Sequence, residues 1–170
     1  MASLQASLRG QTIGGAKDLA VMMANINRLI YDASPSNRYA TFFYAEYAPA
    51  SRQLTYVNCG HNPPLLFRGE EVIRLEAGGP MVGLFRPAKY EQAALALASG
   101  DVLVAFTDGV SEAMNAAEED WSEDRLIETV RACRHLSAAE IIPRIIAAAD
   151  AFVAGAPQHD DMTLLVLRVT

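Results

Sequence analysis

The chain has few cysteines, no cluster of basic residues and no long apolar run. Its two cysteines, Cys59 and Cys133, lack metal-ligand spacing and are interpreted as buried thiols of a reducing compartment. The 14 basic residues are scattered singly among 20 acidic ones, and the net charge of −6 argues against a nucleic-acid surface. No apolar run approaches the ~20 residues of a membrane span, and the start lacks the regions of a signal peptide. We therefore expect a soluble, cytoplasmic protein.

Several catalytic motifs are also missing. The glycine-rich stretch 78–83 has neither the Lys-Ser/Thr ending nor the strand-to-helix setting of a phosphate-binding P-loop, and no Gly-x-Ser-x-Gly elbow occurs. The three histidines, His61, His135 and His159, do not have the spacing of a zinc site. The acidic residues and His61 therefore remain as the candidate functional residues.

The pattern that is present predicts an α+β layered fold. Hydrophobic residues make up 51% and charged residues 20% of 170 residues, which suits one domain with a real core. Strands joined mostly by hairpins, among them 39–47 with 54–59 and 90–97 with 102–106, are segregated from the helices, as in α+β proteins. One expected helix covers about 16–31 and has the apolar stripe Leu19, Met22, Met23, Ile26, Leu29 and Ile30. Two more helices are expected after Ser122, which can cap the first of them, and after Ser137, which forms a capping box with Glu140. The segment 77–84 is expected to be a glycine-rich loop, and the expected strands cover 39–47, 54–59, 65–67, 72–75, 90–97, 102–106 and 164–167.

Acidic residues stand at the ends of two apolar strands. Asp108 follows the run 102–106, which reads as a strand buried on both faces, and Gly109 would let the backbone turn sharply. Asp160 and Asp161 directly precede the last strand. If the two strands are antiparallel neighbours, the three carboxylates share one end of a sheet and suit a hard cation such as Mg²⁺ or Mn²⁺. The alternative is a turn former and a solvated loop.

Three ordered motifs resemble one known family. The segments 107–112 and 160–163 look like motifs of the metal-dependent protein phosphatase superfamily (PPM, protein phosphatase 2C-like). The segments 59–66 and 78–84 are similar to signatures of its bacterial branch, the stage II sporulation protein E-type (SpoIIE-like) serine phosphatases. This resemblance covers essentially the whole chain. It implies a layered α-β-β-α sandwich of antiparallel sheets flanked by helices, with a two-metal Mn²⁺ or Mg²⁺ centre at one end.

The resemblance also implies roles for single residues. Asp108 resembles the metal ligand of the family's Asp-Gly motif, with Gly109 as backbone at the metal site. Asp160 resembles the ligand of the last motif, and Asp161 fills a position that other branches often give to asparagine. The division of labour between these two acids stays open.

His61 and Asn62 match the glycine-histidine-asparagine-proline signature of the bacterial branch. Contact with the substrate is one interpretation of this pair. A loop-shaping role, in which Asn62 bonds to the backbone before Pro63, is the other.

The family's first metal motifs, a Gly-Asp pair and an Asp-x-x-Gly-His-Gly run, precede the helix in which this chain begins. Leu4 and Leu8 have helical spacing with no cap before them, which indicates the same thing. We therefore expect residues 1–170 to be a partial phosphatase domain without its first strands and bridging carboxylates. Such a chain should hold at most one cation and be weakly active or inactive.

The function implied is hydrolysis of phosphoserine or phosphothreonine in a regulatory protein, such as an anti-sigma-factor antagonist, by a metal-activated water. The alternative is a non-catalytic regulatory or binding module that retains the fold. An upstream sensor or receiver domain and a homodimer through the N-terminal helices are further expectations. The helix that carries Met22, Met23 and Ile26 should then be under-buried in this chain.

Overall fold

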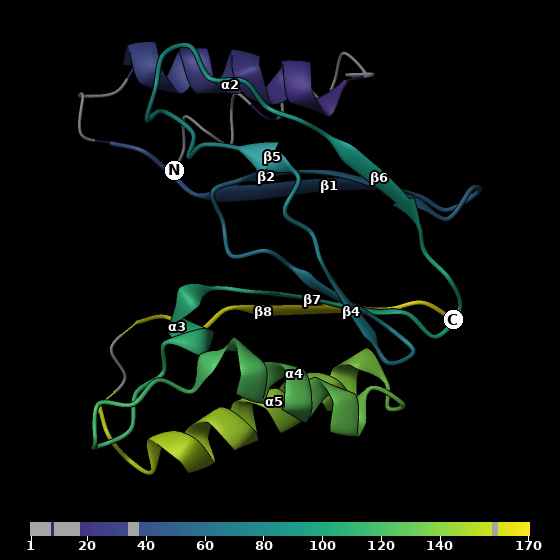
Figure 1. Ribbon diagram of the computed structural model, residues 1–170, viewed down its shortest axis with the longest axis vertical. Helices are drawn as coiled ribbons and strands as arrows, with labels where there is room; N and C mark the ends of the chain where they lie inside the picture. The colour runs from purple at the N-terminus through teal and green to yellow at the C-terminus, as the bar shows by residue number, and fades with distance from the viewer. Residues whose placement is uncertain (1–7, 9–17, 34–37, 158–159) are drawn as a thin grey trace. The chain divides into compact units, whose positions relative to one another are not determined.

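A computed structural model describes residues 8, 18–33, 38–157 and 160–170 of the chain (Figure 1). The chain divides into two compact units that alternate along the sequence: unit 1 comprises residues 1–63 and 75–97, and unit 2 comprises residues 64–74 and 98–170. The single domain over residues 1–170 stays a prediction.

Unit 1 is a small sheet organised around its longest buried strand. Its elements are α2 (Leu19–Ala33), β1 (Phe42–Ala48), β2 (Gln53–Cys59), β5 (Gly78–Gly79) and β6 (Ala93–Ala96). The β1–β2 hairpin is antiparallel, as predicted, and β2 also pairs with β6 antiparallel and with β5 in parallel. The predicted hairpin between the 90–97 strand and the 102–106 strand is wrong. The backbone of β6 bonds instead to β2, about forty residues earlier, a distant pairing that no local pattern reveals.

The two-residue strand β5 depends on its glycines. It pairs with Asn58 and Cys59 of β2 in a stretch that the sequence predicts to be a loop. A Cβ on Gly78 would lie 1.6 Å from the carbonyl oxygen of Asn58, so no larger residue permits this approach. The parallel pairing therefore rests on the absence of a side chain.

Helix α2 buries the stripe predicted for it. Leu19, Met22, Met23 and Ile26 are buried, in a cluster that also contains residues of β2 together with Val82 and Tyr90. The expectation that Met22, Met23 and Ile26 are under-buried is wrong, because β2 and the glycine-rich segment already cover this face. A homodimer through the N-terminal helices stays a prediction. Leu29, predicted to belong to the stripe, is 46% exposed.

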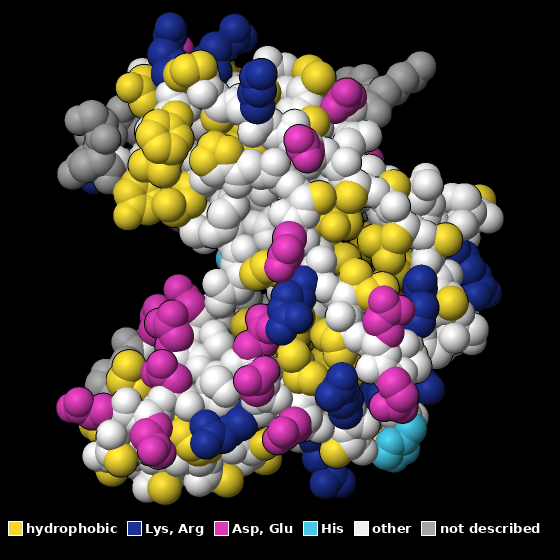
Figure 2. Space-filling model, in the orientation of Figure 1, with side chains coloured by type: hydrophobic (Ala, Val, Ile, Leu, Met, Phe, Trp, Pro, Cys, Tyr) yellow, Lys and Arg dark blue, Asp and Glu magenta, His cyan; other side chains and the backbone are white. Residues whose placement is uncertain are grey.

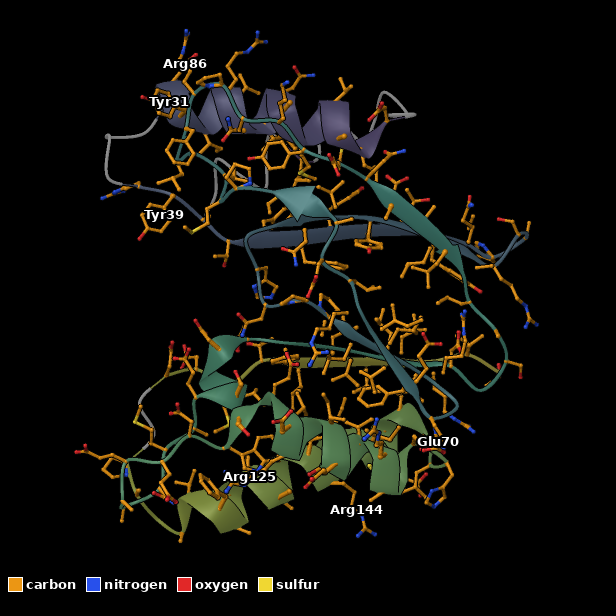
Figure 3. The ribbon with its side chains drawn as sticks, viewed as in Figure 1. Tyr31, Tyr39, Glu70, Arg86, Arg125 and Arg144 are labelled. Carbon is orange, nitrogen blue, oxygen red and sulfur yellow. The ribbon has the colours of Figure 1, made fainter. Side chains whose placement is uncertain are left out.

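Helix α2 is fastened to the glycine-rich segment by one buried asparagine. The Nδ2 of Asn27 donates hydrogen bonds to the carbonyl oxygens of Phe85 (2.8 Å) and Arg86 (3.3 Å). Its Oδ1 accepts a hydrogen bond from the N–H of Gly83 at 2.8 Å. Next to these hydrogen bonds, Arg86 (labelled in Figure 3) forms a surface ion pair with Asp32, with Nε and Oδ1 2.9 Å apart.

Replacing Asn27 by alanine should destabilise the chain by about 2–3 kcal/mol, because buried backbone groups lose their partners. Urea unfolding measures the change. Asn25→Ala is the matched control, since Asn25 lies on the same helix with its side chain partly exposed, and it should cost less than about 1 kcal/mol. Equal losses of unfolding free energy in the two variants would show that the hydrogen bonds of Asn27 add no more stability than a partly exposed asparagine on the same helix.

Both cysteines are buried, as predicted, and neither forms a disulfide. Burial raises the pKa of the Cys59 thiol to about 12 and also raises the pKa of Cys133. Because the thiolate is the reactive form, neither cysteine should react with a thiol reagent at neutral pH while the chain is folded. Both should react in guanidinium chloride. Fast stoichiometric labelling of the native chain would contradict this placement.

Unit 2 is a four-stranded antiparallel sheet in the order β4-β3-β7-β8, covered by helices. Its elements are β3 (Leu65–Arg68), β4 (Glu71–Arg74), β7 (Val102–Phe106), α3 (Asp108–Ser111), α4 (Ser122–Cys133), α5 (Ala138–Val153) and β8 (Leu164–Arg168). The predicted central strand is confirmed: β7 lies between β3 and β8, with four of its five residues buried. Figure 1 shows α4 and α5 side by side along this sheet.

The helices of unit 2 follow the sequence in part. The predicted capping box is confirmed, with the N–H of Ser137 donating to a carboxylate oxygen of Glu140 at 3.0 Å. Ser122 does not cap α4: it is the first helical residue, with φ +70°, whereas an N-cap has extended backbone. The guanidinium of Arg125 lies 4.4 Å from the ring centre of Phe152, which joins α4 to α5 (Figure 3). None of the helices described is both long and apolar enough to cross a membrane.

Candidate metal centre

The two acidic motifs meet at one end of the unit 2 sheet. Strands β7 and β8 are antiparallel neighbours, with Phe106 opposite Leu164. Asp108 follows the end of β7, and Asp160 and Asp161 precede the start of β8. The predicted pairing is therefore confirmed, and the three acidic residues lie at the same end of the sheet.

Thr107 fastens these two segments together. Its backbone N–H donates to the carbonyl oxygen of Thr163 at 3.1 Å, and its Oγ1 donates to the carbonyl oxygen of Asp161 at 3.1 Å. The same Oγ1 accepts a hydrogen bond from the N–H of Thr163 at 3.0 Å. Sequence reasoning gave Thr107 no role, because nothing in its position before Asp108 and Gly109 indicates contacts with residues far along the chain.

Gly109 is required for a close approach rather than for a sharp turn. A Cβ at this position would lie 2.6 Å from the carbonyl oxygen of Asp161 and 3.3 Å from the carbonyl carbon of Asp160. Its φ does not lie in the left-handed region, so the interpretation that glycine permits an unusual turn is wrong. The missing side chain lets the backbone of Asp160 and Asp161 lie directly against the start of α3.

The three acidic residues are exposed. An oxygen of Asp108 accepts a hydrogen bond from the N–H of Gly109 at 3.0 Å, and Asp160 accepts one from the N–H of Asp161 at 2.7 Å. Oxygen donors of this type fit a hard cation. Within the described part of the chain, however, no group of three or more His, Cys, Asp or Glu side chains is gathered closely enough to hold a metal. The donors therefore fit in kind but do not form a complete cage.

His61 and Asn62 belong to unit 1, whereas the three acidic residues belong to unit 2. The residue seen to shape their loop is Asn58, which sequence reasoning missed. The Nδ2 of Asn58 donates to the carbonyl oxygen of His61 (2.9 Å), and its Oδ1 accepts from the N–H of His61 (2.8 Å). Asn58 is buried, and its position in an apolar strand was the available signal. Both interpretations of the His61 and Asn62 side chains stay predictions.

Comparisons with known proteins agree on one family. A family model described as Stage II sporulation protein E (SpoIIE) matches residues 1–170. Phosphoserine phosphatase RsbU of Bacillus subtilis is 32% identical over 155 residues, which cover 86% of this chain and 44% of that protein. Protein IcfG of Synechocystis sp. is 28% identical over 159 residues, which cover 90% of this chain and 25% of that protein. The chain thus spans less than half the length of these relatives.

Solved structures share the fold. The SiaA-PP2C domain of Pseudomonas aeruginosa superposes with a TM-score of 0.84 at 18% identity, covering 99% of this chain and 67% of that one. The catalytic domain of the serine threonine protein phosphatase PstP, in complex with 2 manganese ions, gives a TM-score of 0.64 at 15% identity, with 97% and 77% covered. The predicted α+β fold with antiparallel sheets and flanking helices is confirmed.

Proposed function

Because this chain belongs to the stage II sporulation protein E family of serine/threonine protein phosphatases, we propose that the protein is a metal-dependent phosphatase of bacterial signalling. Its substrate would be phosphoserine or phosphothreonine in a regulatory protein, such as an anti-sigma-factor antagonist. The relatives RsbU and RsbP of Bacillus subtilis, both named phosphoserine phosphatases, support this class of substrate. We also propose that the protein is bacterial and cytoplasmic and that a sensor or receiver domain lies upstream of these residues.

The observation that carries the proposal is the close approach of the two acidic motifs. Thr107 and Gly109 hold the Asp160–Asp161 segment against the start of α3, directly beside Asp108. Fixed backbone on both sides limits how far the carboxylates can move apart. A catalytic cation needs ligands that are carried on backbone fixed in this way.

In the proposed mechanism, Asp108 and Asp160 would hold Mn²⁺ or Mg²⁺, and Asp161 is a further candidate ligand. The bound cation would supply a water of lowered pKa and positive charge for the phosphate oxygens. The exposure of all three acidic residues leaves room for a protein substrate to approach. Thr107 acts as a positioning residue through the backbone of Asp161.

The test is phosphate release from a phosphoserine peptide by the complete reading frame that contains these residues, with the 170-residue chain measured beside it. We expect turnover with Mn²⁺, loss of turnover with a chelator, and recovery when metal is restored. A phosphotyrosine peptide of the same sequence should be a poor substrate. Binding of the phosphopeptide without turnover at any metal concentration would favour a non-catalytic module instead.

A further inference from the structure

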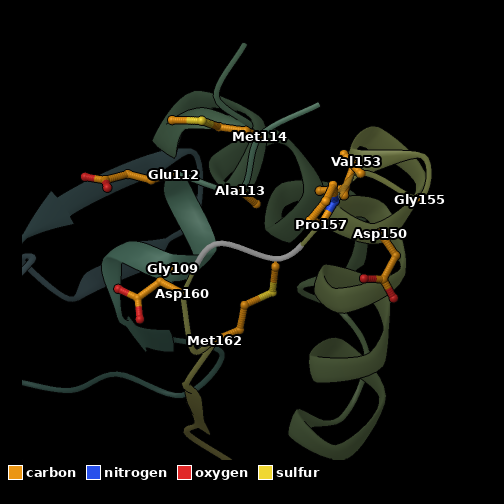
Figure 4. Close-up of a pocket in the computed structure, with 11 residues that line it drawn as sticks. Gly109, Glu112, Ala113, Met114, Asp150, Val153, Gly155, Pro157, Asp160 and Met162 are labelled. Carbon is orange, nitrogen blue, oxygen red and sulfur yellow. The ribbon is translucent and has the colours of Figure 1, made fainter. Parts of the chain in front are cut away.

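A pocket lies in unit 2 beside the candidate metal centre. Its volume is about 340 Å³, at the small end of the range for ligand pockets, and it is partly open to the surface. Gly109 and Asp160 of the candidate centre line one part of it. The remaining described lining comes from residues 112–114 after α3, from Asp150 and Val153 of α5, and from residues 155–157 and 162 (Figure 4).

The middle of the pocket is apolar and its two sides are acidic. Figure 4 shows Glu112 and Asp160 on one side, with their carboxylates directed away from the apolar residues in this view, and Asp150 on the other side. Between them lie the apolar lining residues Ala113, Met162, Val153 and Pro157. Among the described lining residues there is no Lys, Arg or His. An occupant with an apolar stem and a positive end matches this lining.

The helix that ends at the pocket adds to its negative potential. The last turn of α5 contains Asp150 and no basic residue. Carbonyl groups at a helix C-terminus carry partial negative charge and favour cations, so an acid there is unfavourable for the helix itself. The placement of Asp150 therefore works against helix stability and in favour of binding a cation.

Unit 2 as a whole also has a negative net charge. Unit 2 contains 15 acidic and 7 basic residues, a net charge of −8, whereas unit 1 contains 5 acidic and 7 basic residues, a net charge of +2. Figure 2 shows acidic side chains spread over the surface of unit 2 on this face. A field of this sign attracts a basic peptide to the candidate centre, and salt screens the attraction.

We propose that this pocket is the subsite for a lysine or arginine side chain close to the phosphorylated residue of the protein substrate. The proposal rests on the proposed phosphatase function, because Asp160 both lines the pocket and is a candidate ligand of the catalytic cation. A phosphoserine held at the centre has its flanking residues within reach of the pocket. The aliphatic stem of the basic residue contacts Met162 and Val153, and its charged end meets the acidic sides.

The test uses the complete reading frame with Mn²⁺ and a set of phosphoserine peptides. One otherwise neutral peptide is compared with versions in which a single lysine is moved along the sequence, one position at a time. At one position or two neighbouring positions, lysine should raise kcat/KM roughly three- to tenfold over the neutral peptide, as expected for a partly enclosed charge pair. The preference should shrink in high salt.

Two variants assign the preference to the pocket. Asp150→Lys and the milder Asp150→Asn should each remove the lysine preference, whereas Glu128→Lys should keep it. Glu128 is an exposed acid on α4 that does not line the pocket, so it controls for the change in net charge. Because each result is a ratio of two peptides on one enzyme, a partly unfolded variant still reports its preference.

The outcomes separate this subsite from the phosphatase function. Hydrolysis of the neutral peptide with no preferred lysine position, or a preference that survives Asp150→Lys, overturns the subsite and leaves the phosphatase. Absence of hydrolysis for every peptide and for p-nitrophenyl phosphate overturns the proposed function and the subsite with it. A preference lost in both Asp150 variants and kept in Glu128→Lys supports the subsite.

Discussion

Replacing Asp108 by asparagine in the complete reading frame that contains these residues should lower Mn²⁺-dependent phosphate release by at least roughly a hundredfold. The amide is the same size as the carboxylate and can still accept the hydrogen bond from the N–H of Gly109, so the start of α3 should persist. What the change removes is the negative charge that offsets a divalent cation. Mn²⁺ affinity, followed by titration calorimetry, should fall together with kcat/KM.

The matched control is Asp124→Asn, which removes an exposed acid from α4 of the same unit. It changes the net charge equally and should leave both Mn²⁺ affinity and turnover within about twofold, since screened surface charges contribute little. If Asp108→Asn kept its turnover, the assignment of Asp108 to the metal centre would be wrong.

Replacing Gly109 by alanine should damage both stability and metal binding. The added Cβ would lie 2.6 Å from the carbonyl oxygen of Asp161, which is backbone and cannot move aside cheaply. We expect a loss of about 2–4 kcal/mol in the free energy of unfolding, together with at least roughly tenfold weaker Mn²⁺ binding. Urea unfolding and calorimetric titration measure the two effects separately.

Gly100→Ala controls for the loss of a glycine elsewhere in the same unit. Nothing lies within 4 Å of a Cβ built at Gly100, and its φ of +90° makes backbone strain the main cost. This variant should lose about 1 kcal/mol and bind Mn²⁺ normally. Should Gly109→Ala be as mild as Gly100→Ala, the close approach would not be what fixes the Asp160–Asp161 segment.

The sequence predicted the parts of the fold that local pattern determines. The run 102–106 is continuously apolar because it lies in the middle of a sheet, and the strand was found with its observed bounds. The capping box at Ser137 was found because its two partners stand three residues apart in the sequence. The antiparallel pairing of β7 with β8 was the condition on which the predicted metal site depended, and the structure shows that pairing.

What the sequence missed depends on distant contacts. The partner of β6 is β2, and β5 exists because Gly78 can approach Asn58, features with no local signature. Leu29 fits the apolar stripe of α2 and yet lies 46% exposed, since periodicity cannot state how wide the covering surface is.

In the candidate site, too, residues were found where their type was informative and missed where their role depends on distant contacts. Asp108, Asp160 and Asp161 were found from their residue type and their places beside apolar strands. Thr107 was missed because its importance lies in hydrogen bonds to residues more than fifty positions away. Gly109 was found for the wrong reason, since its contact with the Asp160–Asp161 peptide is invisible in the sequence.

Diffraction from crystals soaked in Mn²⁺, recorded at the manganese absorption edge, tests the metal centre most directly. We expect an anomalous peak at the strand-end site, within coordination distance of carboxylate oxygens of Asp108 and Asp160, and no such peak in Asp108→Asn crystals. A peak elsewhere in the molecule, with no density near either carboxylate, would contradict the assignment of the metal centre.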